Sequence, residues 1–377
     1  MKLEIWHNIM WSAYKAGVFN ALAVQAPARG VDVTVIQIAT TSQDREALSQ
    51  VDTSRHRYPF ELLFDTSYSR IPFGDLVSRL AGRVWRTSAD LTMLVEISRP
   101  EYWVQAMILR LRGRRVAVFC DSTLFDHHQT FWKAVAKRAM FALCGDVFCY
   151  GVRAREYALA YGVKPERIFH RNQAAALPDD YDAAGIVARR VAADPGAPLF
   201  LYVGRLSAEK RIETLIEAFA RVAPQMPGAR LRIVGGGPQA EGLKALAASL
   251  GVDGRIEFTG GQRLDQIFEH YLEATAFVLP SWSEPWGLVV NEALHFGCPV
   301  IVSHRVGCVP ELVEDSAAGE VFACEDAGDL AARLLAAPVR YQDRAGVAQA
   351  ALARIAPYTP EAAARTILDG VAKIMAR

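Results

Sequence analysis

The chain has 377 residues and a mass of 41.4 kDa, about twice the usual length of one domain, so we expect two packed domains. Hydrophobic residues make up 51% and charged residues 22%, an ordinary globular composition that argues against disorder. The formal net charge of +1 argues against a strongly basic nucleic-acid binder, although 12 basic and 6 acidic side chains lie between residues 70 and 140.

The start of the chain predicts a β-strand. Its sequence MKLEIWHNIMW has a glutamate inside the apolar run and no small-residue cleavage site after it, which argues against a signal peptide. The six cysteines lie in apolar contexts without a C-x-x-C pair, as is typical of reduced thiols. We therefore expect a cytoplasmic protein, and peripheral attachment to the inner face of the plasma membrane stays open.

The first half alternates β-rich runs with helical periods. The expected elements are strands at 3–9, 31–39, 91–97 and 114–120, and helices near 13–28, 72–86 and 101–112. Strands that alternate with helices predict a parallel sheet covered on both faces. We expect residues 1–180 to form this N-terminal domain.

A change of composition follows. Residues 181–198 are poor in large apolar side chains and rich in Asp, Ala and Pro, which predicts a linker. A second alternating series then predicts a domain at 199–358 and a final helix at 359–377. Its expected strands are 198–204, 230–237, 255–261, 275–281, 298–303 and 319–323, with helices near 209–225, 239–250, 264–272 and 287–296. Ligands of such sheets bind at the carboxyl ends of the strands.

The first strand end of this second series carries two cations. In YVGRLSAEKRIETL, Gly204 ends the strand, Arg205 follows it, and Lys210 lies near the start of the next helix. An arginine fork and a lysine beside free helix amides suit a diphosphate. The alternative is a solvated pair of surface cations.

The next strand ends in a glycine turn, RLRIVGGGPQAEG. Gly235, Gly236 and Gly237 allow a close approach of backbone to a ligand, and Pro238 suits the first turn of a helix. Gly235, Gly237 and Ala240 also match the short dinucleotide pattern G-x-G-x-x-A, an alternative that we rank low because it does not explain the acidic segment that follows.

The segment PSWSEPWGLVVNEAL holds two carboxylates at a spacing that suggests function. Glu284 lies in a loop, and Glu292 falls about one turn into a helix that begins near Gly287, where the amides of Gly287 and Leu288 are free helix-start donors. Cations and amides for a diphosphate, one carboxylate for ribose and one for a transferred sugar are what a nucleotide sugar needs. An acidic cap and an exposed helical glutamate are the alternative.

These motifs resemble family 4 retaining glycosyltransferases of the GT-B fold. The two glutamates separated by seven residues, the preceding VGRL with its lysine, the VGGGP turn and the following GCPVIVS and PELV segments occur in the family's order over residues 198–330. The resemblance implies an α/β fold of two doubly wound Rossmann-like domains that face a central cleft, with the C-terminal helix crossing back to the first domain.

The resemblance also implies roles for individual residues. Arg205 and Lys210 would hold the donor diphosphate, Glu284 the transferred sugar with the amides of Gly287 and Leu288, and Glu292 the ribose. Gly204 would lie beside the diphosphate, and Gly235, Gly236, Gly237 and Pro238 would line the base pocket. The donor substrate is a nucleoside diphosphate sugar, and we expect no cofactor and no metal.

The acceptor side departs from the family pattern. Relatives usually have a Gly-Gly pair after the first strand, whereas this chain has MWSAYKAGVF with a single Gly17. We expect Tyr14 and Lys15 to bind the acceptor, Lys15 through an anionic group, although the aromatic spacing also suits core packing. Asp121, at a strand end, is the candidate for contact with the sugar or acceptor hydroxyl, with capping of the next turn as the alternative.

Two basic amphipathic helices, 75–86 and 131–143, suggest an anionic membrane surface. Leu76, Leu80 and Val84 form an apolar stripe in the first, and Phe131, Trp132, Val135 and Met140 form one in the second. Packing of these stripes on the sheet is the alternative.

Together these features predict a transferase that moves a sugar from a nucleotide sugar to an acceptor hydroxyl. The family resemblance implies that the transfer is retaining, and with the basic helices it suggests a glycan or glycolipid acceptor in bacterial surface glycan synthesis. A GT-B epimerase and a non-catalytic nucleotide-sugar-binding protein are the alternatives.

Overall fold

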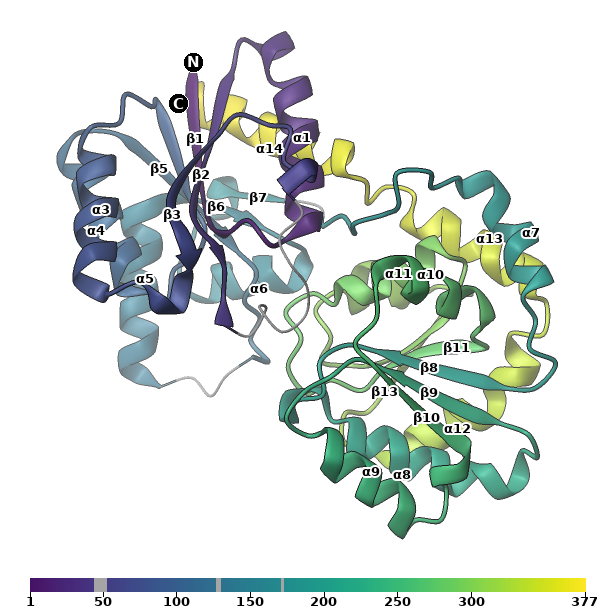
Figure 1. Ribbon diagram of the computed structural model, residues 1–377. Coiled ribbons are helices and arrows are strands. Elements are labelled where there is room, and N and C mark those ends of the chain that lie inside the picture. The colour runs from purple at the N-terminus through teal and green to yellow at the C-terminus, as the bar shows by residue number, and fades with distance from the viewer. Residues whose placement is uncertain (44–52, 127–129, 171–172) are drawn as a thin grey trace. The chain divides into compact units, whose positions relative to one another are not determined.

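The computed structural model describes residues 1–43, 53–126, 130–170 and 173–377, which divide into two compact units (Figure 1). The described residues of Met1–Leu124, His128–Ala176 and Tyr358–Arg377 make up the first unit. Those of Phe125–His127 and Leu177–Pro357 make up the second.

The first unit is built on a seven-stranded parallel sheet in the order β3-β2-β1-β4-β5-β6-β7. Its strands are β1 Lys2–Ile9, β2 Asp32–Thr41, β3 Phe60–Ser67, β4 Leu91–Leu94, β5 Arg115–Cys120, β6 Gly145–Cys149 and β7 Ile168–His170. Its helices are α1 Ala13–Gln25, α3 Phe73–Trp85, α4 Pro100–Leu111, α5 Phe131–Cys144, α6 Val152–Ala160 and α14 Pro360–Met375. The sequence predicted the inner strands and did not predict β3, β6 and β7.

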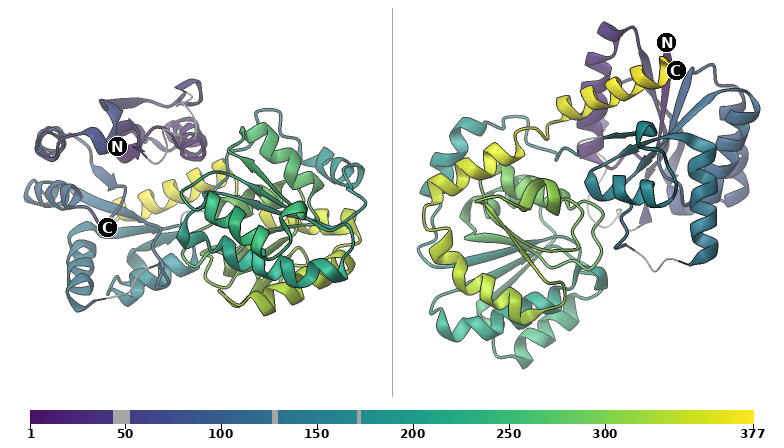
Figure 2. Two further views of the ribbon diagram at one scale, coloured as in Figure 1. Left: turned by 60° about the horizontal axis from the view of Figure 1, so that its bottom comes forward. Right: turned by 180° about the vertical axis from the view of Figure 1, so that it is seen from behind.

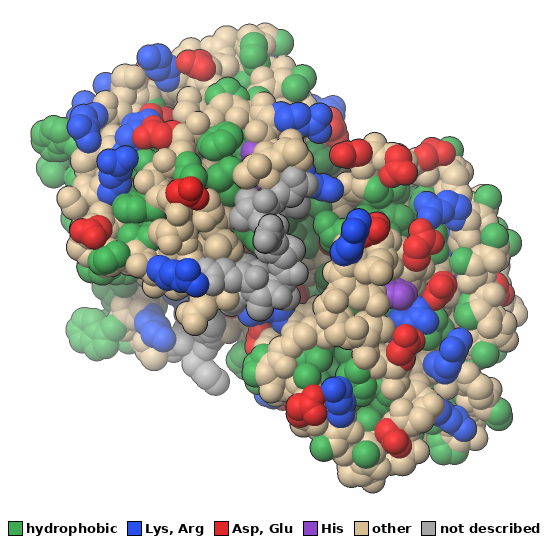
Figure 3. All heavy atoms as spheres, viewed as in Figure 1, with side chains coloured by type: hydrophobic (Ala, Val, Ile, Leu, Met, Phe, Trp, Pro, Cys, Tyr) green, Lys and Arg blue, Asp and Glu red, His purple; other side chains and the backbone are tan. Residues whose placement is uncertain are grey.

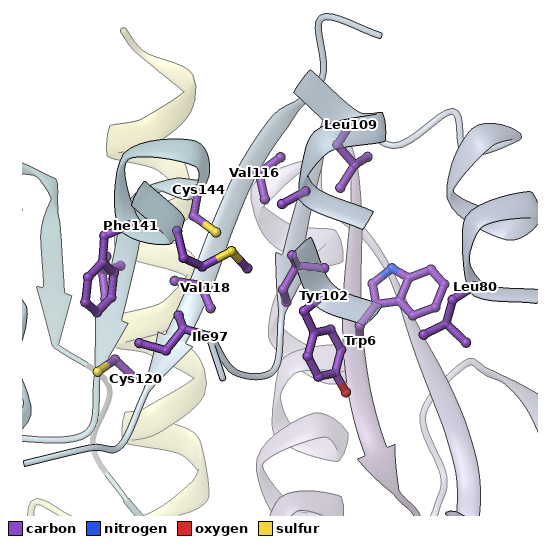
Figure 4. Close-up of a cluster of buried hydrophobic side chains, with 14 of the residues drawn as sticks. Trp6, Leu80, Ile97, Tyr102, Leu109, Val116, Val118, Cys120, Phe141 and Cys144 are labelled. Carbon is purple, nitrogen blue, oxygen red and sulfur yellow. The ribbon is translucent and has the colours of Figure 1, made fainter. Parts of the chain in front are cut away.

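A hydrophobic cluster between this sheet and its helices holds Trp6, Leu80 and Tyr102, all fully buried (Figure 4). Leu76 and Val84 of α3 belong to the same cluster. The prediction that the apolar stripe of α3 faces a membrane is therefore wrong, because this stripe supplies one face of the core.

The C-terminal helix α14 packs against α1 in the first unit, as Figure 2 shows from two sides. Ion pairs and hydrogen bonds hold it: Arg29 bonds Asp369 at 2.5 Å, and Arg115 donates to the carbonyl of Ile374. A Cβ at Gly370 would lie 2.5 Å from the ring of Phe148, so a glycine is needed where α14 crosses β6.

The second unit has a six-stranded parallel sheet in the order β10-β9-β8-β11-β12-β13. The strands are β8 Leu199–Val203, β9 Arg230–Val234, β10 Ile256–Gly260, β11 Ala276–Leu279, β12 Val300–Ser303 and β13 Gly319–Phe322. The helices are α7 Ala183–Ala192, α8 Ile212–Val222, α9 Ala240–Ser249, α10 Leu264–Glu273, α11 Leu288–His295, α12 Ala327–Arg340 and α13 Arg344–Ile355. From β8 the chain adds strands first on one side, β9 and β10, and then on the other side, β11 to β13. Doubly wound sheets bind ligands at such a switch point, where the loops after the two central strands, here β8 and β11, diverge.

The predicted linker at 181–198 contains a helix instead. Asp182 caps α7 by accepting from the amide of Ala184, and α7 packs against α13 within the second unit. Its buried side chains are Ile186 and Arg190, the latter only 1% exposed. The prediction failed because a single isoleucine and the stem of one arginine form most of the buried face, so the composition is that of a linker.

Within the described parts of the chain, no helix combines the length and the apolar character needed to cross a bilayer.

Candidate functional site

The loop after β8 presents Arg205 at the carboxyl edge of the second sheet. The Tyr202 hydroxyl, on the strand itself, donates to the Arg205 carbonyl at 2.8 Å. The Arg205 guanidinium bonds the Glu209 carboxylate at 3.2 Å, and the Arg205 side chain remains 40% exposed. The strand therefore fixes the backbone of Arg205, and its guanidinium has open surface on which to meet an anion.

Lys210 and Glu284 form the closest charged contact at this edge. Lys210 ends a short 3₁₀ turn, Ala208–Lys210, and its Nζ lies 2.5 Å from Oε2 of Glu284 in the loop after β11. The two side chains are only 13% and 17% exposed. The structure thus brings together one predicted cation and one predicted carboxylate that lie 74 residues apart in the sequence.

Backbone contacts fix the loop that carries Glu284. The amide of Trp282 donates to the Glu209 carbonyl at 2.9 Å, which ties this loop to the segment that carries Lys210. The amide of Gly307 donates to the Glu284 carbonyl at 2.8 Å, and that of Cys308 to the Trp286 carbonyl at 3.0 Å. Glu284 is therefore held on both sides by main-chain hydrogen bonds.

The glycine turn after β9 packs closely against the loop after β8. A Cβ at Gly235 would lie 1.9 Å from the Gly204 carbonyl oxygen, and one at Gly237 would lie 2.4 Å from the Leu206 carbonyl oxygen. At Gly236 an added Cβ would meet nothing within 4 Å. Two of the glycines thus allow the loops after β8 and β9 to touch, and Gly236 keeps open space. The expectation that the turn lines a base pocket stays a prediction. Pro238 is exposed and lies two residues before α9 rather than in its first turn.

Helix α11 starts at this same edge. Gly287 is its N-cap, with a φ of 94°, and Leu288 is its first residue. The left-handed φ favours glycine, and a Cβ at Gly287 would lie 3.4 Å from Cγ of Glu284, so the helix start is next to that carboxylate. The first amides of a helix have no partner within the helix, and they favour an anion.

Glu292 lies one turn into α11 and is partly exposed. The hydroxyl of Tyr271, on α10, donates to its Oε2 at 3.1 Å. Burial, opposed by the hydrogen bond from Tyr271, raises the pKa of Glu292 to about 7. Glu292 lies on the helix that Gly287 caps, and its hydrogen-bond partner Tyr271 belongs to α10, whereas the Lys210 and Glu284 pair joins a 3₁₀ turn to the loop after β11.

Sequence reasoning gave no role to two residues that shape this site, Tyr202 and Tyr271. Both are completely buried, Tyr202 in the apolar strand β8 and Tyr271 on the apolar face of the amphipathic helix α10, so their pattern is that of core residues. Burial, followed by the charges of Glu284 and Glu209, raises the pKa of Tyr202 well above its ordinary value. A buried tyrosine needs a hydrogen-bond partner for its hydroxyl group, so a tyrosine at a core position was the sign in the sequence that a polar partner lies nearby.

In the first unit, the predicted acceptor residues lie at the carboxyl edge of the sheet. Lys15, in the first turn of α1, is 6% exposed and donates to the hydroxyl of Tyr150, whose ring centroid is 4.4 Å from its Nζ. Tyr14 is partly exposed, with its ring centroid 5.3 Å from the same atom. Asp121 is exposed directly after β5, and Tyr150 directly after β6, whose last residue pairs with that of β5. Tyr150 therefore links Lys15 to the strand ends near Asp121.

No group of three or more histidine, cysteine, aspartate or glutamate side chains in the described residues is arranged to hold a metal ion. The expectation that the reaction needs no metal stays a prediction.

The first half of α5 exposes apolar and basic side chains together. Phe131 is 73% and Trp132 is 78% exposed, and Val135, Lys133 and Arg138 are also exposed, whereas Met140 is buried. Figure 3 shows apolar side chains that protrude from the first unit where Figure 1 draws α3, α4 and α5. The predicted amphipathic surface is thus limited to the start of α5.

Comparisons with known proteins show which proteins this chain resembles. Residues 166–345 match the family model described as "Glycosyl transferases group 1". The sulfoquinovosyl transferase SQD2 of Arabidopsis thaliana is 34% identical over 137 residues, which are 36% of this chain and 25% of that protein. A D-inositol 3-phosphate glycosyltransferase of Segniliparus rotundus is 37% identical over 166 residues, 42% of this chain and 37% of that protein. Each alignment thus spans well under half of the relative.

Among solved structures, that of Anabaena Alr3699/HepE in complex with UDP and glucose is similar to this chain with a TM-score of 0.72. The superposition covers 99% of each chain, and the sequences are 18% identical. That likeness shows the fold. The predicted fold class, GT-B with two Rossmann-like α/β units, is confirmed, and so is the resemblance to this group of glycosyltransferases.

Proposed function

We propose that this chain, which matches the group 1 glycosyl transferases over residues 166–345, transfers a sugar from a nucleoside diphosphate sugar to an acceptor hydroxyl with retention of configuration. The contact between Lys210 and Glu284 carries the proposal, because it sets a cation and a carboxylate beside the start of α11. Retention follows from the family resemblance.

The chemistry of the proposed reaction is leaving-group stabilisation. Negative charge builds on the diphosphate as the sugar becomes oxocarbenium-like, and fixed cations and helix-start amides offset it. In this assignment Arg205, Lys210 and the amides of Gly287 and Leu288 bind the diphosphate. Glu284 accepts from hydroxyls of the sugar, and Glu292 accepts from those of the ribose.

The proposed acceptor site lies in the first unit. Tyr14 and Lys15 would bind an acceptor with an anionic group, and Asp121 would contact its hydroxyl. A lipid-linked or polysaccharide acceptor of bacterial surface glycan synthesis is the proposed class. It rests on the family resemblance and on the exposed basic and aromatic side chains of α5.

The test begins with binding of UDP, since a solved structure with the same fold holds UDP, followed by ADP, GDP and dTDP and their sugars. A ligand that binds only the native state raises the unfolding midpoint, so the correct donor gives the largest shift. Transfer is then measured with glycan and glycolipid acceptors, and the anomeric configuration of the product is read by NMR. Because no metal is proposed, excess EDTA should leave the rate unchanged.

Three outcomes of this test would contradict the proposal. Conversion of the sugar nucleotide in the absence of any acceptor would identify an epimerase. Tight binding without turnover in the presence of every acceptor would indicate a sugar-nucleotide sensor. An inverted anomeric configuration of the product would overturn retention.

We also propose that the start of α5 attaches the protein to anionic membranes. Aromatic side chains beside cations suit the interface of an anionic bilayer. We expect the double variant Phe131→Ala, Trp132→Ala to bind vesicles of anionic phospholipid about 10²-fold more weakly or worse, because two aromatic side chains that each contribute about 1.5–3 kcal/mol when buried in the bilayer are lost. Co-sedimentation at low salt measures this.

The matched control is Leu335→Ala, Val339→Ala, which removes an exposed apolar pair from α12 in the second unit. This control should bind vesicles as the wild type does. Absence of wild-type binding at low salt, or equal loss in both double variants, would end the membrane proposal.

A further inference from the structure

The carboxylate of Glu292 is oriented from outside its own helix. Tyr271, which is completely buried, donates its hydroxyl hydrogen bond to Oε2 of Glu292 at 3.1 Å. The Tyr271 ring packs edge-on against Phe277 and parallel to Phe296, with ring centroids 5.7 and 6.4 Å away. The tyrosine therefore has one position, and its hydroxyl restricts the rotation of Glu292.

Two arginines fix the turn of α10 that carries Tyr271. Arg190 of α7 is 1% exposed and donates to the carbonyls of Tyr271 at 2.7 Å, Leu272 at 3.1 Å and Ala274 at 2.8 Å. Arg344 of α13 donates to the Leu272 carbonyl at 2.7 Å. The last carbonyls of a helix have no partners within it and favour cations, so these guanidinium groups cap α10. The helix in the predicted linker thus supports the site.

Resting on the proposed function, we infer that Tyr271 is a positioning residue that holds Glu292 as an oriented, ionised acceptor for the two ribose hydroxyls of the donor. A hydrogen bond to one carboxylate oxygen fixes the plane of the group and leaves its other lone pairs for the ligand. Arg190 supports the tyrosine through the backbone of α10.

The hydrogen bond from Tyr271 also affects the charge of Glu292. The pKa of Glu292 is about 7, because the rise caused by burial is larger than the opposing effect of the Tyr271 hydroxyl, which favours the ionised form. Removing the hydroxyl should raise the pKa further. At neutral pH a larger fraction of Glu292 is then protonated and unable to accept from both ribose hydroxyls.

The titratable groups on the elements around Glu292 have other partners. Strands β11 and β12 carry none within their spans, and Lys210 pairs with Glu284. Burial raises the pKa of Cys298, the thiol that follows α11, so this group stays neutral. The remaining groups and their partners are Asp265 with Arg263, Glu269 with Arg189, His270 and Glu273 with Arg232, His295 with Tyr181, Arg344 with the Leu272 carbonyl, and Arg354 with the Glu314 carbonyl.

The experiment compares UDP binding by the wild type and Tyr271→Phe, using calorimetry at pH 6.5 and pH 9. A hydrogen bond to a charged group is worth about one pKa unit, which predicts about five- to ten-fold weaker binding than the wild type at pH 6.5. At pH 9 both proteins have an ionised Glu292, so the difference should fall to about two-fold, which is the loss that remains because the carboxylate is no longer oriented. The ratio of the two proteins at each pH cancels titration of UDP itself.

A double-mutant cycle with Glu292→Gln adds a second measurement. The amide has no charge to titrate, so Tyr271→Phe should have little further effect on UDP binding in that background. Tyr341→Phe is the matched control, because this buried tyrosine of the same unit faces Glu320 and Arg340 instead of Glu292. It should bind UDP as the wild type does at both pH values.

The outcomes separate the two proposals. If Glu292→Gln weakens binding but Tyr271→Phe matches the wild type at pH 6.5, or loses the same factor at both pH values, the inference about Tyr271 is wrong and the donor site stands. If the wild type binds none of the four nucleoside diphosphates, or Glu292→Gln binds as well as the wild type, the donor site itself is wrong and the inference falls with it.

Discussion

Replacement of Lys210 by alanine should lower the rate of sugar transfer by about 10²–10³-fold at saturating donor, the usual effect of removing one fixed donor from a site of developing charge. The ammonium lies 2.5 Å from Glu284, and both side chains are largely buried. Removal leaves Glu284 partly buried without its cation, and it removes a charge that the proposed diphosphate needs. Initial rates with the identified donor and acceptor measure the effect.

Lys244→Ala is the control for this result. Lys244 lies on α9 in the same unit and pairs with Glu241 at 2.8 Å, but both side chains are at least half exposed. Such surface pairs contribute little, so transfer should stay within about two-fold of the wild type. Wild-type rates for Lys210→Ala, with an unchanged unfolding midpoint, would remove Lys210 from the site.

The sequence predicted the alternation of strands and helices and the strand ends that carry the site. Alternating apolar runs determine which segments are strands, and the parallel order then places the loops after β8 and β11 at one edge. The contact between Lys210 and Glu284 follows from that arrangement. The motif resemblance supplied the roles of these residues, since spacing alone leaves each charge open to a surface reading.

The features that the sequence did not predict depend on contacts distant in the chain. Strands β3, β6 and β7 are short or lie in less regular segments, and Asp146 within β6 reduces its apolar character. Helix α7 buries an arginine whose partners are carbonyl groups more than 80 residues away. A pattern-based reading assigns a charged residue to the surface, and only the end of α10 explains why Arg190 is buried.

The difference between the two amphipathic helices also depends on contacts that the sequence pattern does not show. The spacing of Leu76, Leu80 and Val84 in α3 suits a membrane surface and a protein core equally well. The structure places all three in the core, while Phe131 and Trp132 at the start of α5 stay exposed. Burial, which periodicity cannot supply, distinguishes the two helices.

Replacement of Gly307 by alanine should both destabilise the second unit and strongly reduce transfer. An added Cβ would lie 1.7 Å from the Pro285 carbonyl oxygen and 3.0 Å from Cα of Trp286. These atoms are backbone, so no side-chain rotation relieves the clash, and the loop that carries Glu284 has to move. Overpacking of this kind costs about 1–3 kcal/mol, which lowers the unfolding midpoint by several degrees.

The effect on transfer should exceed the effect on stability, because a displacement of about 1 Å at a reacting group costs about 10²-fold in rate. The amide of Gly307 donates to the Glu284 carbonyl at 2.8 Å, so the shift passes directly to the residue that we propose binds the sugar. Gly242→Ala is the control: it lies within α9, an added Cβ meets nothing within 4 Å, and alanine in a helix should raise stability by about 0.5–1 kcal/mol. Thermal unfolding and initial rates of both variants measure the two effects, and a Gly307→Ala protein with wild-type stability and turnover would show that this loop does not position Glu284.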